Sequence, residues 1–510
     1  MRLRQLLDPG VTVVHPVNSS VGTGDRDPDI SSLAVDSRDV TDGALFAALM
    51  GSNVDGRAFI GQAIERGAVA ILGDPSLAGM ALDVPLILDP EPRRQLALMA
   101  ARFSRRQPNH VVAVTGTSGK TSVASLVRQI WTTLGHGAGT LGTLGLHTDH
   151  RTIAGGLTTP DPVRLHALLC ELADDGVDHL AIEASSHGLD QHRLDGIRIA
   201  AAAFTNLSHD HLDYHHTFEA YLAAKARLFG ELLSDDGVAV LHADVPEFPH
   251  LKAIVESRGL DLIDYGRDAS ALRLVERVDG LKGQRLRVAY GERVHDVTTQ
   301  LVGNFQAANL LAAIGLVLAD STEDVPAVFR AAAMVQGAPG RLQLIGHNQK
   351  GAPVFVDYAH KPDALEKVLA TLRPHTDGRL FVVFGCGGDR DVEKRPLMGK
   401  IAVERADKVF ITDDNPRSED PATIRRQILK AAPGAVDVAD RAEAIHLAVS
   451  MLDVGDVLVV AGKGHETGQI IGGDVLPFDD AAVVSEALAI KAGDQSTAHR
   501  LGAAEYGKIR

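Results

Sequence analysis

A short glycine-rich segment places a lysine and several hydroxyl groups directly after an apolar run. The segment TGTSGKTS covers residues 115–122, and the apolar run covers residues 110–114. Backbone N–H groups of such a loop can bind phosphates at the positive end of a helix, where Lys120 reaches the β- and γ-phosphates and Thr121 holds Mg²⁺. The general P-loop pattern has a glycine where Val114 stands, so only its second half is matched. An ordinary glycine-rich turn is the alternative, but strand, loop and helix in this order favour a nucleotide site.

Acidic, imidazole and amine groups form a second candidate constellation. Glu183 ends an apolar run, the segment NLSHDHLDYH covers residues 206–215, and Lys225 lies in a helical pattern. The histidines could bind zinc, but zinc sites usually combine Cys and His, and no cysteine is near. Solvated surface side chains are the alternative for His215 and His216. The neighbours of Lys225 are apolar, and removal from water would favour the neutral form of its amine. The alternative is an ordinary surface lysine, whose hydrocarbon chain packs on the protein while its charged end lies in water.

Four apolar runs in the last third of the chain each end in a polar or glycine-rich turn. Their sequences are DYAHKP, GCGGDRD, TDDNPR and AGKGHE, after the runs 354–356, 380–384, 409–411 and 457–460. Ligands bind at the carboxyl ends of the strands in open parallel sheets. The sequence therefore predicts a second site at the edge where these turns meet.

Alternating apolar runs and helical patterns predict an α/β fold with parallel sheets. Residues 123–134 carry an apolar stripe at helical spacing, and Gly135 closes it. A polar linker around Pro108 and a Gly-Ala-Pro-Gly break at residues 337–340 suggest two boundaries. We therefore expect three domains, covering residues 1–108, 109–337 and 338–510.

Composition excludes several classes of protein. The 510 residues carry a formal net charge of −15, which argues against nonspecific binding to nucleic acid. No stretch of 18 apolar residues and no signal-like segment is present, so we expect no membrane span and a cytoplasmic protein. The two cysteines, Cys170 and Cys386, are expected to be reduced thiols.

The loop with Gly116 and Gly119 resembles that of the Mur ligases and of their relatives, the folylpolyglutamate synthetases. Ser118 stands where Mur loops often have asparagine. Further matches extend over almost the whole chain, and Asp-Asn-Pro-Arg at residues 414–417 resembles the signature of the branch that adds meso-diaminopimelate. The resemblance implies a UDP-sugar-binding N-terminal domain, a central P-loop domain for ATP and a C-terminal Rossmann-like domain for the amino acid.

The resemblance also implies a set of site residues. The catalytic residues would be Lys120, Glu183, His211 and Lys225, and the metal ligands Thr121, Glu183, His211 and Lys225, with Lys225 carrying a CO₂-derived carbamate. ATP would contact Gly116, Thr117, Ser118, Gly119, Lys120, Thr121, Ser122, Asn304, Arg341 and Asp357. The UDP-muropeptide would contact Val35, Ser37, Ser52, Asn53, Val54, Thr158, Thr159, Ser185, Gln191 and Arg193. Diaminopimelate would contact Arg390, Asp414, Asn415, Pro416, Arg417, Gly462 and Glu466. We expect neighbours such as Asp414 to hold Arg417.

The implied activity is formation of an amide in peptidoglycan biosynthesis. ATP would phosphorylate the γ-carboxylate of UDP-N-acetylmuramoyl-L-alanyl-D-glutamate, and diaminopimelate would attack the acyl phosphate, with Mg²⁺ as cofactor. The expected partners are these three small molecules, without nucleic acid, and we expect a monomer. Two alternatives remain open. One is another amide ligase of the superfamily, either a Mur ligase that adds lysine or a folylpolyglutamate synthetase. The other is a nucleotide-dependent scaffold without ligase chemistry.

Overall fold

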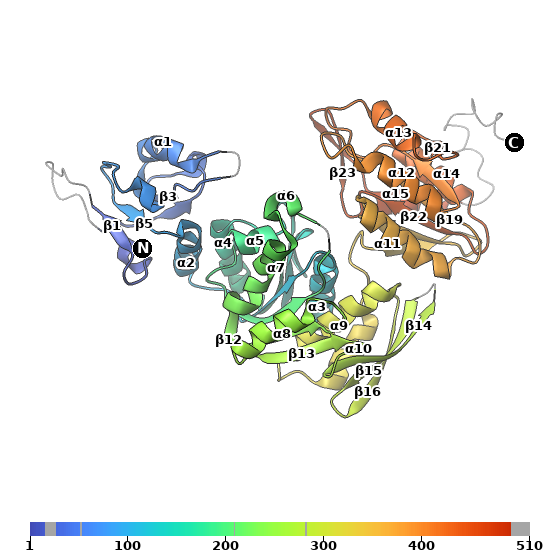
Figure 1. The fold of residues 1–510 in the computed structure, drawn as a ribbon, viewed down its shortest axis with the longest axis horizontal. Coiled ribbons are helices and arrows are strands. Elements are labelled where there is room, and N and C mark those ends of the chain that lie inside the picture. Colours follow the sequence, from blue (N-terminus) through green and yellow to red (C-terminus); the bar gives the residue numbers. More distant parts are fainter. Residues whose placement is uncertain (16–26, 52–53, 209, 281–282, 491–510) are drawn as a thin grey trace. The chain divides into compact units, whose positions relative to one another are not determined.

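The computed structural model of the chain describes residues 1–15, 27–51, 54–208, 210–280 and 283–490 (Figure 1). The chain divides into two compact units. Unit 1 comprises residues 1–275, 287–296 and 308–333, and unit 2 comprises residues 276–286, 297–307 and 334–510. Within the described ranges, no helix has both the length and the apolar character needed to cross a membrane.

The first sheet of unit 1 has five strands and a helix on each face. Its elements are β1 (Thr12–Val14), β2 (Ser32–Ala34), β3 (Ala44–Ala47), α1 (Ile60–Glu65), β4 (Ala68–Gly73), β5 (Leu86–Leu88) and α2 (Pro92–Ser104). The strand order is β1-β5-β4-β3-β2, with β1 antiparallel and the others parallel. Apolar side chains pack under α2 on one face and under α1 on the other. Burial of both faces explains why these strands are continuous apolar runs.

An eleven-stranded sheet follows the first sheet in sequence. Its strands are β6 (His110–Thr115), β7 (Ala138–Gly142), β8 (Gly145–Thr148), β9 (Thr152–Ala154), β10 (His179–Glu183), β11 (Ile199–Phe204), β12 (Leu233–His242), β13 (Asp261–Gly266), β14 (Leu272–Gly280), β15 (Gly283–Tyr290) and β16 (Arg293–Thr299). Their order is β16-β15-β14-β13-β12-β11-β6-β10-β7-β8-β9. The strands from β7 to β13 in this order run parallel, whereas β8 and β9 join as antiparallel strands. β6 therefore lies inside the parallel part, between β11 and β10.

The helices of this segment connect and cover those strands. They are α3 (Lys120–Leu134), α4 (Pro162–Asp174), α5 (Ser186–Asp190), α6 (Leu212–His215), α7 (Phe218–Arg227), α8 (Phe248–Ser257), α9 (Asn304–Leu318) and α10 (Val325–Met334). The predicted stripe of α3 is buried, and Gly135 ends the helix with a φ of 97°. α3 follows β6 directly, so the loop between them lies at the carboxyl end of a central parallel strand, where open α/β sheets bind ligands.

Unit 2 contains a six-stranded sheet between two layers of helices. Its elements are β17 (Gln343–His347), β18 (Pro353–Asp357), α11 (Pro362–Leu372), β19 (Leu380–Phe384), α12 (Lys394–Arg405), β20 (Lys408–Ile411), α13 (Pro421–Leu429), β21 (Val436–Asp437), α14 (Arg441–Ser450), β22 (Val457–Ala461) and α15 (Asp480–Ala489), with the hairpin β23 (Gly468–Ile471) and β24 (Asp474–Pro477). The order is β17-β18-β22-β19-β20-β21, and only β17 is antiparallel to its neighbour. One face packs against α11, α12 and α13, and the other against α14 and α15 (Figure 1).

The predicted α/β class is confirmed, and so are the strands on which the site prediction rests. β6, β10, β18, β19, β20 and β22 lie where apolar runs predict them, within one or two residues. The two predicted domain boundaries stay predictions, although each of the three sequence segments contains one of the large sheets. The strands β12 to β16 had no counterpart in the sequence analysis.

Candidate functional site

Two glycines determine the shape of the loop between β6 and α3. Gly116 has a φ of 144° and Gly119 a φ of 91°, which is backbone that side chains disfavour. A Cβ atom at Gly116 would lie 1.9 Å from Oγ1 of Thr205, and one at Gly119 would lie 2.5 Å from Oδ1 of Asn309. Both positions therefore require glycine for two reasons, conformation and space.

The segment after β11 forms hydrogen bonds with the backbone of this loop. Nδ2 of Asn206 donates to the carbonyl oxygen of Ser118 at 3.1 Å, and the backbone N–H of Ser118 donates to Oδ1 of Asn206 at 3.1 Å. Oγ1 of Thr205 donates to the same carbonyl at 2.7 Å. These bonds fix the loop before any ligand binds. Thr205, Asn206 and Asn309 were missing from the predicted site, although Asn206 opens the predicted histidine motif.

Two lysines converge on one carbonyl oxygen of the loop. Nζ of Lys120 donates to the carbonyl of Gly116 at 2.8 Å and to that of Thr117 at 3.1 Å, and Nζ of Lys225 donates to Gly116 at 2.9 Å. Lys225 is 1% exposed, and its Nζ lies 4.4 Å from the ring centre of Tyr221. Burial, and then the positive charge of Lys120, lower the pKa of Lys225 well below its usual range. The structure therefore favours the neutral amine of Lys225.

Glu183 is buried at the carboxyl end of β10. Its Oε2 accepts hydrogen bonds from Oγ1 of Thr121 and from Oγ1 of Thr143, both at 3.1 Å. Its Oε1 accepts a 2.8 Å bond from the backbone N–H of Thr143. A carboxylate beside a hydroxyl is the type of oxygen donor set that Mg²⁺ prefers, so these residues fit the predicted metal. Thr143 was missing from the predicted site.

His211 lies among aromatic side chains close to Lys225. Its ring centre lies 4.8 Å from that of His187 and 6.2 Å from that of Tyr221, whose hydroxyl lies 3.1 Å from Oγ1 of Thr117. Burial raises the pKa of Tyr221 to about 12, so its hydroxyl stays protonated. Of the histidines expected to be solvated, His215 is buried and His216 is exposed. Burial of His215 corrects that expectation, because the turn α6 folds its ring onto Tyr221 at 5.1 Å.

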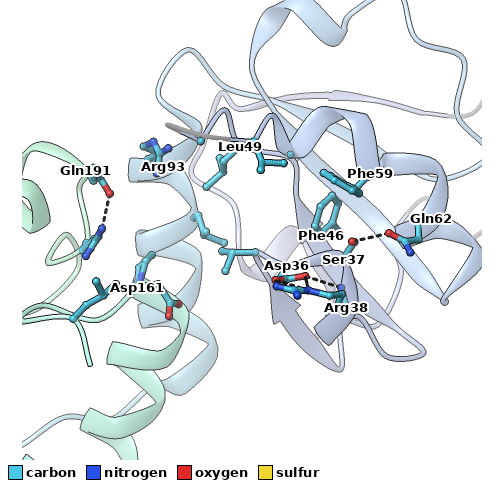
Figure 2. Close-up of a pocket in the computed structure, with 18 residues that line it drawn as sticks. Asp36, Ser37, Arg38, Phe46, Leu49, Phe59, Gln62, Arg93, Asp161 and Gln191 are labelled. Atoms are coloured by element: carbon cyan, nitrogen blue, oxygen red, sulfur yellow. Dashed lines mark hydrogen bonds and ion pairs between the residues drawn. The ribbon is translucent and has the colours of Figure 1, made fainter. Parts of the chain in front are cut away.

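A cavity of about 690 Å³ lies within unit 1, and half of the residues predicted to contact the muropeptide line it (Figure 2). The predicted residues that line it are Val35, Ser37, Val54, Gln191 and Arg193. The wall also includes Arg38 and Arg93, which were not predicted. Arg38 is paired with Asp36 of the same wall, whereas the guanidinium groups of Arg93 and Arg193 suit an anionic ligand such as a nucleoside diphosphate. Ser52 and Asn53 lie outside the described residues.

The remaining predicted muropeptide residues form one hydrogen-bonded network beside Glu183. Oγ1 of Thr159 donates to the backbone carbonyl of Glu183 at 2.8 Å and lies 3.0 Å from Oγ of Ser185. Nη1 of Arg193 donates to the carbonyl of Thr159 at 2.7 Å. Oγ1 of Thr158 lies 3.1 Å from Oγ1 of Thr143. This network links the arginine of the cavity to the carboxylate of the phosphate site.

In unit 2, the predicted nucleotide residues Arg341 and Asp357 lie close together, although they belong to different segments of the chain. The guanidinium carbon of Arg341 lies 4.6 Å from the ring centre of Tyr358. Asp357 accepts backbone N–H bonds from Leu342 at 2.6 Å and from Ala359 at 2.7 Å. Burial raises the pKa of Asp357 despite the opposing charge of Arg341. Asn304 is the first residue of α9.

The Asp-Asn-Pro-Arg turn after β20 contains a buried polar network. Nδ2 of Asn415 donates to Oε2 of Glu466 at 2.8 Å, and Nζ of Lys463 donates to Oδ1 of Asn415 at 3.0 Å and to Oε2 of Glu466 at 3.3 Å. A Cβ at Gly462 would lie 2.7 Å from Oδ2 of Asp414. The structure therefore brings four predicted residues together and adds Lys463, which lies in the AGKGHE turn but was not predicted.

The side chain of Arg417 contacts a different turn, the one that contains Gly388. Arg417 has a φ of 51°, and its Nη1 donates to the carbonyl oxygen of Gly388 at 2.9 Å, whereas Asp414 was the expected holder. The carbonyl of Pro416 would lie 1.9 Å from a Cβ at Gly388, so the two turns touch through their backbones. Arg390 is exposed on the same turn as Gly388.

Three family models match the chain over most of its length. They are described as Mur ligase family, catalytic domain (residues 29–104), Mur ligase middle domain (residues 114–317) and Mur ligase, glutamate ligase domain (residues 340–464). A protein of Bradyrhizobium diazoefficiens, named UDP-N-acetylmuramoyl-L-alanyl-D-glutamate–2,6-diaminopimelate ligase, is 52% identical over 96% of this chain and 99% of its own length.

Solved structures agree with these matches. A structure with the same ligase name is 33% identical, covers 90% of this chain and 94% of its own, and has a TM-score of 0.68. A Mycobacterium tuberculosis folylpolyglutamate synthase complexed with ADP and AMPPCP shares the fold at 23% identity, with a TM-score of 0.59 and 73% of this chain covered. Sequence, family models and fold all lead to one conclusion, that the chain belongs to the Mur ligase family.

Proposed function

We propose that this enzyme uses ATP to join diaminopimelate to the γ-carboxylate of the D-glutamyl residue in UDP-N-acetylmuramoyl-L-alanyl-D-glutamate. Membership of the Mur ligase family and the names of relatives that match along nearly the whole chain support this activity. The observation that carries the choice of amino acid is the turn at residues 414–417. It joins Asn415 to Glu466 and Lys463, and its Arg417 donates to the carbonyl oxygen of Gly388 in the neighbouring turn.

The phosphate site of unit 1 would neutralise the negative charge of ATP next to a carboxylate substrate. Lys120 and the backbone N–H groups of the loop would supply positive charge at the start of α3, where bonds to Thr205 and Asn206 hold the loop backbone. Charge stabilisation is the main requirement, because phosphoryl transfer to a carboxylate brings two anions together. The product is an acyl phosphate, whose carbonyl carbon accepts the amine and releases inorganic phosphate.

Mg²⁺ bound here would stabilise charge on the β- and γ-phosphates as a Lewis acid. Thr121 and Glu183 are the proposed ligands beside the nucleotide, and Glu183, His211 and Lys225 those of a second ion. The neutral amine of Lys225 would add to CO₂: an N–C bond forms, one C=O bond pair becomes a carboxylate lone pair, and the nitrogen releases one proton. The buried position and lowered pKa of Lys225 support this modification.

The turn of unit 2 would recognise the end of diaminopimelate that does not react. Arg417 offers two parallel N–H donors to the distal carboxylate, and Glu466 accepts from the distal ammonium. Asn415 holds Glu466 in place, so it positions that contact. We propose the meso isomer as the substrate. The cavity lined by Ser37 and Arg193 would bind the UDP-sugar.

Product analysis tests this proposal directly. The protein is incubated with ATP, Mg²⁺, the UDP-dipeptide and a panel of meso-diaminopimelate, LL-diaminopimelate, lysine and glutamate. Mass spectrometry identifies the adduct, and ADP release is measured in parallel. We expect an adduct with meso-diaminopimelate. An adduct with lysine alone, a folate-dependent product, or nucleotide binding without any amide would contradict the proposal and identify the corresponding alternative.

A further inference from the structure

Three histidines and three carboxylates gather at the opposite end of the same strands that carry the phosphate site. They are His110, His136, Asp178, His179, Asp320 and Glu323. His110 and His179 are the first residues of β6 and β10, whose last residues are Thr115 and Glu183. At about 3.3 Å per residue, the two ends of these strands lie about 13–17 Å apart. The cluster is therefore distinct from the proposed catalytic site.

The cluster contains two overlapping sets with spacing suited to a metal ion. Ligand atoms of His136, Asp178 and His179 lie within 4.8 Å of one another, and so do those of His179, Asp320 and Glu323. Nε2 of His136 lies 2.6 Å from Oε1 of Glu323. The ligand atoms of a tetrahedral ion with bonds near 2.0 Å lie about 3.3 Å apart. This separation falls between the 2.6 Å and 4.8 Å given above, so small side-chain movements would bring these atoms to the distances that the ion needs.

His179 has the hydrogen-bonding pattern of a metal ligand. Its Nδ1 lies 2.9 Å from Oδ1 of Asp178, so the ring donates its proton there and Nε2 keeps a lone pair. The side chain is 10% exposed, and within the described part of the chain its buried Nε2 has no hydrogen-bond partner. A buried acceptor without a partner is costly. A carboxylate behind the ring is the usual second partner of a metal-bound histidine.

We propose that His179, Asp320 and Glu323 bind one divalent transition-metal ion of the zinc type, with His136, whose Nε2 lies beside Oε1 of Glu323, as a further ligand and Asp178 orienting His179. Two imidazoles with carboxylates suit zinc, whereas Mg²⁺ prefers oxygen ligands alone. His136 is 29% exposed, so an ion can enter from solvent. Trp131 closes the site, with its ring 5.0 Å from that of His179.

The ion would clamp the elements that shape the phosphate loop. His136 follows α3, which begins at Lys120, and His179 begins β10, which ends at Glu183. Asp320 and Glu323 follow α9, which carries Asn309 next to Gly119. A metal at this edge would therefore stabilise the helices and strands under the loop without contacting a substrate. We expect a structural role rather than a catalytic one.

Metal titration of the full chain, without an affinity tag and after treatment with a chelator, tests the site. Zn²⁺ alone is added and followed by calorimetry and thermal unfolding. We expect about one equivalent to bind and the Tm to rise by roughly 2–6 °C when zinc is about 100-fold above its Kd. Mg²⁺ at the same concentration should leave the Tm unchanged. Co²⁺ bound in place of Zn²⁺ should give visible absorption bands typical of a low coordination number.

Variants distinguish this cluster from other histidines. His136→Gln and Glu323→Gln should abolish the zinc-dependent rise in Tm, and they keep side chains able to form hydrogen bonds if the fold needs them. His250→Ala, at an exposed position of α8, and His211→Ala, at the other end of the strands, should retain it. Absence of stoichiometric zinc binding by the parent, or full binding by both glutamine variants, would overturn the proposal.

Discussion

The phosphate loop of unit 1 and the Asp-Asn-Pro-Arg turn of unit 2 hold their lysine side chains in different ways. In the loop, Lys120 and Lys225 both donate to the neutral carbonyl of Gly116. In the turn, the buried amine of Lys463 lies 3.3 Å from the carboxylate of Glu466 and also donates to Asn415. The first site places the cation of Lys120 and the neutral amine of Lys225 on a neutral acceptor, and the second pairs opposite charges within the protein.

This difference matches the charges of the two proposed ligands. A polyphosphate supplies the anions that bring charge balance to the loop, so ligand binding there gains the most from electrostatics. An amino acid with charges of both signs needs a site where donors and acceptors already occupy fixed places. Charge content therefore dominates the first site, and geometry dominates the second. The four predictions below test this contrast, from the largest expected effect to the smallest.

Replacing Lys120 should have the largest effect. Lys120→Ala removes the cation at the helix start, and we expect ADP release to fall on the order of 1,000-fold or more while the Tm changes little. Lys252→Ala, an exposed lysine of α8 that pairs with Glu256, is the matched control and should keep normal activity. Normal ADP release from a folded Lys120→Ala protein would show that charge does not dominate this site.

Lys225 tests whether a carbamate contributes to the same site. Lys225→Ala should lower kcat roughly 100- to 1,000-fold, and a short carboxylic acid in the buffer should restore part of it by supplying metal-ligand oxygens. Lys120→Ala should gain nothing from the same acid, since its missing group is a cation. An active parent whose mass spectrum and 13C-labelled CO₂ exchange show only the free amine would contradict the carbamate.

Arg417 tests whether geometry decides the choice of amino acid. Truncating one partner of a buried charge pair costs about 2–5 kcal/mol, or roughly 30- to 4,000-fold. Arg417 is only partly buried, so we expect Arg417→Ala to reduce the preference for diaminopimelate over lysine by roughly 30- to 100-fold in kcat/KM. Arg417→Lys keeps the charge without the parallel donors and should recover little of the preference. An unchanged ratio in both variants would show that Arg417 is not the selector.

The smallest expected effect is a change in the stability of the unmodified protein. Because the pKa of Lys225 is lowered on folding, the unfolded chain binds more protons there, and stability from this group rises with pH toward the ordinary lysine value near 10.5. Lys225→Met removes the buried amine, while Lys120 still donates to Gly116. We expect its Tm, measured in CO₂-free buffer, to exceed the parent's by about 2–4 °C near pH 7.

This advantage should shrink as the pH rises toward 10, because the parent gains the stability that the variant lacks. Lys252→Met is the exposed control and should show no such pH dependence. A constant difference between Lys225→Met and the parent across this range would mean that the amine stays charged in the folded protein, which would contradict the neutral amine of Lys225.

Sequence patterns predicted the strands and turns of both sites more reliably than the contacts within them. The alternating runs Leu272–Gly280 and Gly283–Tyr290 show the limit even for strands, because their buried leucines and valines alternate with arginines and were not recognised. The role of Arg417 as a site residue stays a prediction, whereas its expected partner was wrong, because its Nη1 donates to Gly388 rather than to Asp414. Its bond to Gly388 depends on how two turns approach, which neither turn encodes alone.

The sequence by itself determined the order of strand, loop and helix, the glycines of the loop and the residue types of each turn. These are local properties, because backbone hydrogen bonding, helical periodicity and turn chemistry act over a few residues. Tertiary structure alone decided that Lys225 is buried against Gly116, that Asn206 supports Ser118, and that His179, Asp320 and Glu323 meet at one end of the sheet. Such contacts depend on strand order and register, which join segments far apart in the chain and which local periodicity leaves open.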